Sequence, residues 1–217
     1  MFSLADQRFM DTALALAMAQ LGRTAPNPSV GCVLVRNGRI VGRGATADGG
    51  RPHAERRALD EAGELARGSH AYVTLEPCAF HGKTPPCADA LVAAGIAAVD
   101  IACLDAHPKV DGRGVEILRA AGITVRTGLR TDQARPVYDG FFHRLATGLP
   151  RVYVDARPAR YDAELTAPLT ADLEKALRTL GEAGANRVCV APGSPLVPSL
   201  AAAGLLAAEA VAGNTVR

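Results

Sequence analysis

The stretch that decides the fold of this chain runs from His53-Ala54-Glu55 through Pro77-Cys78 to Pro86-Cys87. One imidazole and two thiols are three zinc ligands, one short of a closed tetrahedron. A catalytic zinc keeps its fourth position open for water, whereas a structural zinc fills all four. Glu55 follows the histidine by two residues, close enough to handle protons without being a ligand. The sequence therefore predicts a catalytic zinc site with His53, Cys78 and Cys87 as ligands.

The two cysteines are farther apart than in the plain C-x-x-C pattern. His81 stands where that pattern would place the second thiol, and the nearest thiol is Cys87, after Pro85-Pro86. Two consecutive prolines fix two φ angles and favour an extended chain, so a stiff loop can bring Cys87 to the metal. The alternative is a pair of buried cysteines joined by an ordinary loop. Three ligands, an acid and a proline before each cysteine favour the metal site.

Composition is that of an ordinary globular enzyme. The 217 residues are 48% hydrophobic and 21% charged, with a net charge of +2 that gives no electrostatic case for nucleic-acid binding. The apolar run in residues 1–20 is interrupted by Asp6, Arg8 and Asp11, so it suits an amphipathic helix better than a signal peptide or membrane span. Five cysteines, two of them assigned to metal, favour a reducing compartment, by default the cytoplasm.

Strands and helices are expected to alternate along the first two thirds of the chain. The Asn37-Gly38 pair is a strong hairpin signal between the first two strands. This alternation predicts an α/β sandwich. The expected strands are 29–35, 40–44, 71–75, 97–103 and 123–126, and the expected helices are 4–21, 54–67, 88–94 and 114–121. His53 and Cys87 each fall at a helix start, where the positive end of the helix dipole favours a thiolate.

The character of the chain changes after Pro150. Residues 151–217 are expected to form a helix over 173–182, a strand over 187–190 and an alanine-rich helix over 198–212. So short a segment makes a marginal core by itself. We therefore expect two parts, a domain over 1–149 and a C-terminal segment over 150–217 that packs on that domain or on a partner subunit.

The chemistry expected of Glu55 follows from the metal beside it. Zinc lowers the pKa of water from 15.7 to about 7 and so supplies hydroxide near neutrality. Displacing an exocyclic amine from a heteroaromatic ring needs that nucleophile, with protons delivered to a ring nitrogen and to the leaving amine. Glu55 would take a proton from the water and pass it to those positions. Its alternative role is a solvated acid in the first turn of a helix.

The residues around the ligands narrow the class of enzyme. The H-x-E…P-C pattern is the signature of zinc-dependent nucleobase deaminases. Over about residues 5–150, the chain closely resembles the pyrimidine deaminase of riboflavin biosynthesis, including the long insertion between the cysteines. The resemblance rests on Thr24-Ala25-Pro26-Asn27-Pro28-Ser29-Val30-Gly31, Gly50-Arg51-Pro52-His53-Ala54-Glu55, Thr74-Leu75-Glu76-Pro77-Cys78, His81-Gly82-Lys83-Thr84-Pro85-Pro86-Cys87, Asp105-Ala106-His107-Pro108-Lys109-Val110, Gly112-Arg113-Gly114 and Gly140-Phe141-Phe142-His143-Arg144.

The resemblance implies a three-layer α/β/α sandwich of the cytidine deaminase-like type, with a central mixed sheet and one zinc ion per subunit. It implies hydrolysis of 2,5-diamino-6-ribosylamino-4(3H)-pyrimidinone 5′-phosphate to 5-amino-6-ribosylaminouracil 5′-phosphate and ammonia. It also favours a homodimer or larger homo-oligomer. No membrane or nucleic-acid partner is expected, and no dinucleotide site, because the Gly-Arg-Gly pairs at 42–44 and 112–114 do not complete G-x-G-x-x-G.

Three further residues are implied in substrate binding. Asn27 offers an amide donor and an acceptor suited to a pyrimidinone edge, although an asparagine between two prolines can also serve only a turn. His81 and Lys83 lie on the inserted loop, where a cation could hold the ribose 5′-phosphate; solvated loop charges are the alternative. His107 stands where the family commonly has an asparagine, which leaves the contacts of that loop open.

The tail matches the family only in fragments. Many members carry a longer second domain that reduces the deaminated product with NADPH. Here Asp155 falls near the position of a lysine, and Val190-Ala191-Pro192-Gly193 replaces the expected Val-Glu-Gly-Gly. We therefore expect no reductase activity and a separate protein for that step. Two alternatives stay open, namely another nucleoside or base deaminase of the superfamily and a catalytically idle paralogue in which zinc organises a regulatory module.

Overall fold

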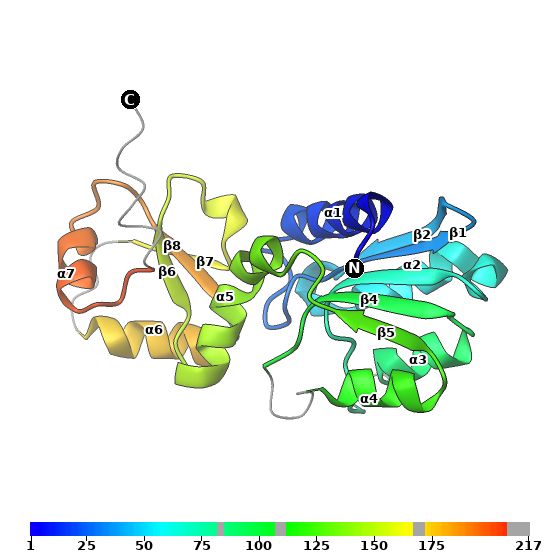
Figure 1. Cartoon of the computed structure of the whole chain (residues 1–217). Helices are drawn as coiled ribbons and strands as arrows, with labels where there is room; N and C mark the ends of the chain where they lie inside the picture. The colour runs from blue at the N-terminus through cyan, green and yellow to red at the C-terminus, as the bar shows by residue number, and fades with distance from the viewer. Residues whose placement is uncertain (82–84, 107–111, 167–171, 208–217) are drawn as a thin grey trace.

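The structure is a computed structural model that describes residues 1–81, 85–106, 112–166 and 172–207. Figure 1 shows two sheets that lie side by side, with helix α5 (Thr131–Thr147) between them. We call residues 1–147 the first unit and residues 151–207 the second unit. Each has a hydrophobic core of its own.

The first unit is built on a five-stranded mixed sheet. Its strand order is β2-β1-β3-β4-β5, in which β1 runs antiparallel to both of its neighbours and β3, β4 and β5 are parallel. Asn37 and Gly38 both have positive φ, of 50° and 73°, as the two-residue hairpin requires. The strands span Gly31–Arg36 (β1), Arg39–Ala45 (β2), His70–Leu75 (β3), Ala98–Cys103 (β4) and Thr124–Thr127 (β5).

Helices cover both faces of this sheet and make three layers (Figure 1). One face carries α1 (Leu4–Ala19) and α5; the other carries α2 (Ala54–Ala62), α3 (Cys87–Ala93) and α4 (Arg113–Ala120). The α/β sandwich with a central mixed sheet is thus confirmed. The helix expected over 54–67 is shorter, because Gly63 takes φ 53° and ends α2 before a 3₁₀ turn (Gly63–Ala66).

Helix α5 has no counterpart among the expected elements. It contains Pro136, which lacks an N–H and normally breaks a helix interior. Burial compensates here, because Tyr138 is fully buried and Phe141 is 8% exposed. The phenol of Tyr138 donates to Thr74 Oγ1 near the end of β3, so tertiary contacts tie this helix to the sheet.

The second unit is a small parallel sheet flanked by helices. Its strand order is β6-β8-β7, with bounds Arg151–Val154 (β6), Ala163–Leu165 (β7) and Arg187–Val190 (β8). Helix α6 (Leu173–Glu182) and strand β8 have the predicted bounds. The alanine-rich helix is different from the prediction: α7 spans Leu196–Ala202, Leu206 forms a bridge with Val152, and 208–212 lie outside the described residues.

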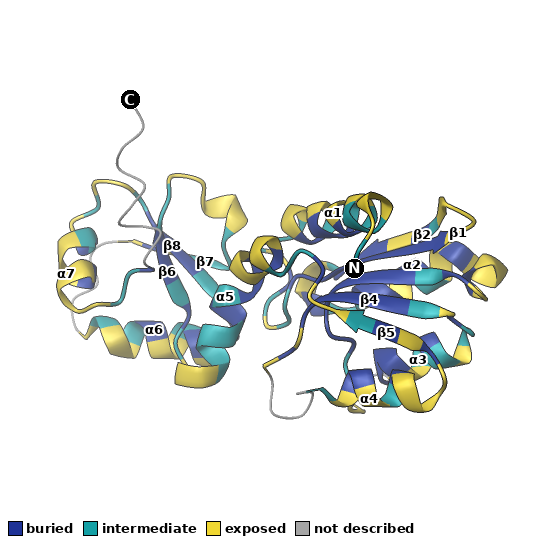
Figure 2. Ribbon diagram, viewed as in Figure 1, coloured by how far each residue is buried: buried dark blue, intermediate teal, exposed yellow. Residues whose placement is uncertain are grey.

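The two units pack closely at two glycines, which have no side chain to keep the backbones apart. A Cβ built on Gly140 of α5 would lie 2.5 Å from the carbonyl oxygen of Asn186, and one on Gly184 would lie 2.6 Å from Cβ of Pro26. Figure 2 shows that buried residues line the strands of both sheets. The predicted boundary at residues 149 and 150 falls between α5 and β6, and its status as a domain boundary stays a prediction.

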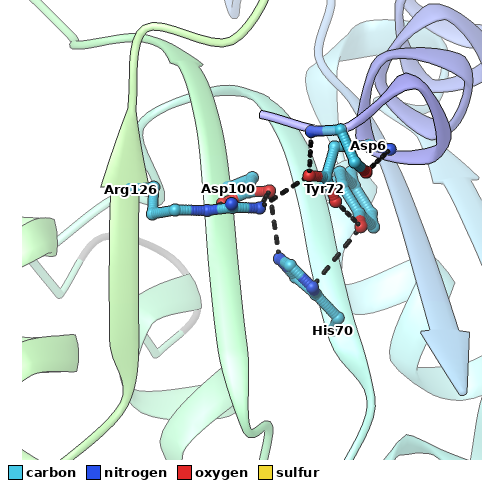
Figure 3. Close-up of polar contacts among 6 residues, drawn as sticks. Asp6, His70, Tyr72, Asp100 and Arg126 are labelled. Carbon is cyan, nitrogen blue, oxygen red and sulfur yellow. Dashed lines mark hydrogen bonds and ion pairs between the residues drawn. The ribbon is translucent and has the colours of Figure 1, made fainter. Parts of the chain in front are cut away.

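A polar cluster crosses the sheet beneath α1 (Figure 3). Tyr72, Asp100 and Arg126 are register neighbours on β3, β4 and β5. Arg126 binds both carboxylate oxygens of Asp100, and the Tyr72 hydroxyl donates to Oδ1 of Asp6 on α1 at 2.7 Å. His70 Nε2 lies 3.1 Å from Oδ2 of Asp100. Asp6 also lies 3.1 Å from Nη2 of Arg126, so the cluster attaches α1 directly to β3 and β5.

Candidate functional site

The three predicted metal ligands meet at the carboxyl end of β3. Nδ1 of His53 lies 3.7 Å from Sγ of Cys78 and 3.4 Å from Sγ of Cys87. A nitrogen about 2.0 Å and a sulfur about 2.3 Å from one tetrahedral zinc are roughly 3.6 Å apart. All three ligand atoms lie within 4.8 Å of one another. The donor set and its spacing therefore fit a tetrahedral zinc ion.

Each ligand is placed by the end of an element. His53 is the N-cap residue of α2, and Cys87 is the first residue of α3. Cys78 follows β3 by three residues, and its Sγ accepts a hydrogen bond from the Cys87 main-chain N–H at 3.3 Å. The N–H at the start of α3 therefore favours a thiolate at Cys78, whereas the sequence pattern predicts the favoured thiolate at Cys87, which opens the helix.

The two thiols have different affinities for a proton. Hydrogen bonds from Cys87 and His53 lower the pKa of Cys78 to about 4 against its burial. The same contact with Cys78, together with burial, raises the pKa of Cys87, and the contact with Cys78 raises the pKa of His53. The lowered pKa of Cys78 favours its thiolate, which is the form that binds a metal ion.

Glu55 is buried beside the ligands, in the first turn of α2. It is 4% exposed, and burial raises its pKa to about 7, partly offset by His53. A carboxyl group with that pKa can both accept and release a proton near neutrality. Its burial rules out the alternative of a solvated first-turn acid.

A cavity of about 260 Å³ opens onto His53, Cys78 and Glu55. Asn27 lies in its wall: its Nδ2 donates to the Gly50 carbonyl at 2.7 Å and is 3.3 Å from Nε2 of His53. Arg51 and Arg144 bring positive charge to the same cavity, which has an otherwise mixed lining. The lining residues are Pro26, Asn27, Pro28, Val30, Thr46, Arg51, His53, Glu55, Leu75, Glu76, Cys78, Phe80, Asp105, Phe141, Arg144 and Leu145.

The described part of the chain does not bring together the residues predicted to bind the substrate phosphate, His81 and Lys83. His81 is described and exposed. Lys83 and His107 lie outside the described residues. The roles of Asn27, His81 and Lys83 in substrate binding therefore stay predictions.

Glu76 is a site residue that the sequence reasoning missed. It is 3% exposed, and its carboxylate accepts hydrogen bonds from the main-chain N–H groups of Asp105, Gly112, Gly114 and Val115, at 3.3, 3.2, 2.9 and 3.3 Å. It thus joins the end of β3 to the start of α4 at the cavity wall. An acid in a Thr-Leu-Glu-Pro-Cys run was the available signal, but the partners are main-chain groups that a sequence does not reveal.

A second cluster of ligand-type groups is formed by Asp6, His70 and Asp100. It lies at the amino end of β3, which begins at His70 (Figure 3). Cys78 follows the carboxyl end of the same strand. Arg126 already supplies positive charge there, through two contacts with Asp100 and one of 3.1 Å with Asp6. The Asp6–His70–Asp100 cluster is therefore explained as part of an ion-pair network with Arg126 and not as a metal site.

Within the described ranges, no helix combines the length and the apolar character needed to cross a membrane. The match to a family model covers residues 4–103, and that model describes the cytidine and deoxycytidylate deaminase zinc-binding region. The match includes His53, Glu55, Cys78 and Cys87, so zinc binding is suggested by the family as well as by the ligand geometry.

Two curated relatives resemble the chain in sequence. Riboflavin biosynthesis protein RibD of Haemophilus influenzae is 52% identical over 151 residues, which are 70% of this chain but 41% of that protein. The diaminohydroxyphosphoribosylamino-pyrimidine deaminase of Buchnera aphidicola (subsp. Schizaphis graminum) is 50% identical over 145 residues, which are 67% of this chain and 99% of that protein. The chain thus spans about two fifths of the RibD relative and nearly all of the shorter deaminase.

A solved structure extends the similarity beyond the first unit. Acinetobacter baumannii RibD superimposes with a TM-score of 0.81 and 29% sequence identity, over 93% of this chain and 84% of that chain. Because residues 1–147 make up less than 93% of the chain, this likeness includes part of the second unit.

Proposed function

Because the chain belongs to the riboflavin-biosynthesis diaminohydroxyphosphoribosylaminopyrimidine deaminase family, we propose that it hydrolyses the exocyclic amine of 2,5-diamino-6-ribosylamino-4(3H)-pyrimidinone 5′-phosphate. The products are 5-amino-6-ribosylaminouracil 5′-phosphate and ammonia. One observation carries the proposal: three zinc-type ligand atoms lie within 4.8 Å of one another, and two of these ligands line one cavity together with the buried Glu55.

His53, Cys78 and Cys87 would hold one zinc ion per chain. When bound, zinc supplies hydroxide near neutral pH by lowering the pKa of water. Glu55 takes up the proton that the attacking water loses and returns protons to a ring nitrogen and to the departing amine. Its burial keeps bulk water from competing for those protons.

Substrate binding is assigned to groups at the cavity. Asn27 lies close to His53, where its amide would read the polar edge of the pyrimidinone ring. Arg51 supplies positive charge at the cavity wall. His81 and Lys83, on the segment between the two cysteines, would hold the ribose 5′-phosphate. Replacing Lys83 with alanine should then raise KM more for the phosphorylated substrate than for its dephosphorylated form.

The deciding experiment is a substrate panel. Zinc-loaded protein is incubated with the diaminopyrimidinone phosphate and, in parallel, with cytidine, guanine and their phosphates, while ammonia release is measured. We expect release with the diaminopyrimidinone phosphate and little with the others. Release only from another base or nucleotide would indicate a different deaminase of the superfamily. An inactive protein that retains zinc would indicate a regulatory module.

Residues 150–217, which include the second unit, are proposed to be a remnant of a reductase domain. The likeness to RibD over 93% of this chain supports that origin. The replacement of Val-Glu-Gly-Gly by Val190-Ala191-Pro192-Gly193 supports the loss of reductase activity. A separate reductase would then act on the product. Oxidation of NADPH by the purified protein in the presence of the deaminated product would refute this part of the proposal.

We further propose a cytoplasmic homodimer or larger homo-oligomer that acts on this small phosphorylated pyrimidine without nucleic acid or membrane. The assembly is tested by light scattering coupled to gel filtration.

A further inference from the structure

A series of hydrogen bonds runs from the second unit to the wall of the cavity. Asn186 comes just before β8 and is 5% exposed. Its Oδ1 accepts a hydrogen bond from Nε of Arg144 at 2.7 Å, and Nη2 of Arg144 donates to the carbonyl oxygen of Pro26 at 2.9 Å. Nδ2 of Asn186 donates to the carbonyl oxygens of Pro26 and Asn27, each at 3.4 Å. A side chain of the second unit therefore contacts the segment that we call the pocket loop, residues 24–28.

The pocket loop determines where the amide of Asn27 lies. The loop closes on itself, since Asn27 N–H donates to the Thr24 carbonyl at 3.0 Å and Thr24 Oγ1 donates to the Asn27 carbonyl at 3.0 Å. The Asn27 side chain then reaches Gly50 and His53. Moving the main chain at Pro26 or Asn27 would move this amide relative to the metal ligands.

Asn186 is itself held firmly. Oδ2 of Asp162 accepts the main-chain N–H groups of Asn186 and Arg187, at 2.8 and 2.9 Å. The Asn186 carbonyl accepts the N–H of Arg151 at 3.0 Å. Gly184, with φ +100°, brings the preceding turn against Pro26 with no room for a Cβ. The second unit thus presents Asn186 to the pocket loop from a closely packed, hydrogen-bonded surface.

Arg144 needs the contacts that Asn186 provides. It is half-buried, and burial lowers the pKa of its guanidinium. A partly desolvated cation requires hydrogen-bond acceptors, and the acceptors here are an amide oxygen and a main-chain carbonyl. Removing the amide oxygen would leave Nε of Arg144 without this partner and release its hold on Pro26.

We propose that Asn186 is a positioning residue for the deaminase pocket: acting both directly and through Arg144, it fixes the pocket loop and thereby the amide of Asn27. The second unit then helps to position the pocket loop beside the metal ligands of the first unit. This role does not depend on reductase activity. This inference rests on the proposed deaminase function for its kinetic consequence, but its structural consequence is measured independently of activity.

The test compares Asn186→Ala and Asn186→Asp with the control Asp155→Asn in the full chain. Asp155 accepts hydrogen bonds from Arg157 and Tyr161 within the second unit, so its replacement perturbs that unit without altering the contacts of Asn186. Asn186→Asp keeps an oxygen for Arg144 but removes the donor to two carbonyls and repels them, which makes it the second variant if Asn186→Ala does not fold. Amide hydrogen exchange of residues 24–28, zinc content and the kinetics of ammonia release are measured.

We expect both Asn186 variants to retain zinc, to exchange faster at residues 24–28 and to raise KM by about tenfold with a smaller change in kcat. For Asn186→Ala that size corresponds to losing the hydrogen bond to the charged Arg144. For Asn186→Asp it comes from losing the donor to the two loop carbonyls and repelling them. The control Asp155→Asn should match the wild type in hydrogen exchange at residues 24–28, in zinc content and in the kinetics of ammonia release. The double variant Asn186→Ala, Arg144→Ala should raise KM by less than the two single variants combined, because the two side chains bind each other and share the Pro26 carbonyl as an acceptor.

The inference would be overturned if folded Asn186 variants exchanged amide hydrogens at residues 24–28 as slowly as the wild type. It would also be overturned if the changes in KM of the two single variants simply added in the double variant. Failure of the wild-type protein to release ammonia would instead overturn the proposed function, and the exchange experiment would still decide the role of Asn186.

Discussion

Nδ1 of His53 lies 3.4 Å from Sγ of Cys87, although the two residues are 34 positions apart in the chain. Two helix starts on the same side of the sheet bring them together, with α2 opening at His53 and α3 at Cys87. The spacing suits a shared metal ion, and it makes the ligand set testable by single substitutions.

Replacing Cys87 with alanine should strip the protein of zinc. Removing a ligand should cost more than the roughly 10- to 100-fold loss of affinity that follows changes to groups behind a ligand. Zinc per chain is measured by mass spectrometry of metals after gel filtration. Cys189→Ala is the matched control, because Cys189 is a buried thiol of β8 in the second unit. Full zinc retention by Cys87→Ala would remove this cysteine from the ligand set.

Glu55→Gln should retain zinc and lose turnover. The amide preserves shape but cannot take up a proton, and a positioned acid–base group contributes about 10²- to 10⁴-fold to rate. We expect kcat to fall within that range while zinc content stays at the wild-type value. Glu64→Gln, at an exposed position, is the control. Undiminished ammonia release by Glu55→Gln would exclude the proton-transfer role.

Glu76→Gln should destabilise the first unit and weaken substrate binding together. The carboxylate accepts four main-chain hydrogen bonds, two on each oxygen, and an amide nitrogen in place of one oxygen cannot accept the two that this oxygen receives. The expected loss is on the order of 3 kcal/mol in the free energy of unfolding, since hydrogen bonds to charged groups are each worth about 1.5–3 kcal/mol. Denaturant unfolding measures it, with the exposed Glu116→Gln on α4 as control. Equal stability of the two variants would contradict this account.

The ion-pair cluster of Figure 3 should make stability depend on acid pH. Burial by itself would raise the pKa of Asp100, but hydrogen bonds from His70 and Arg126 outweigh burial and lower it. The pKa of Asp6 is lowered in the same way, by hydrogen bonds from Ser3, Tyr72 and Arg126 that outweigh its burial.

The direction of the effect follows from these shifts. A carboxylate with a lowered pKa in the folded state contributes stability above its unfolded pKa of about 3.9, and that contribution is lost as pH falls through the folded value. Asp100→Asn should therefore be less stable than the wild type at pH 7, on the order of 3 kcal/mol, as expected when one partner of a buried pair is removed. The difference should shrink below about pH 4. Thermal unfolding of both proteins from pH 7 to pH 3 measures it; a constant difference would show that the charge of Asp100 is not its cause.

Much of the first unit was predictable from the sequence, because local signals determine it. Alternating apolar runs marked the strands, and Asn37-Gly38 marked the hairpin. Helix α5 was missed since Pro136 is locally unfavourable, and only the burial of Tyr138 and Phe141 outweighs it. The predicted helix over 198–212 was too long, because alanine content favours a helix but says nothing about Leu206 pairing with Val152.

The sequence by itself determined the chemistry of the site. The ligand types, their order and the acid two residues after the histidine can be read directly, because a zinc ion accepts few donor types. Only the tertiary structure decided which distant groups hold that site in shape. Glu76 binding four main-chain amides and Asn186 reaching the pocket loop through Arg144 are contacts between separate segments. Such contacts leave no local pattern in the sequence, because their partners are brought together by the packing of the two units.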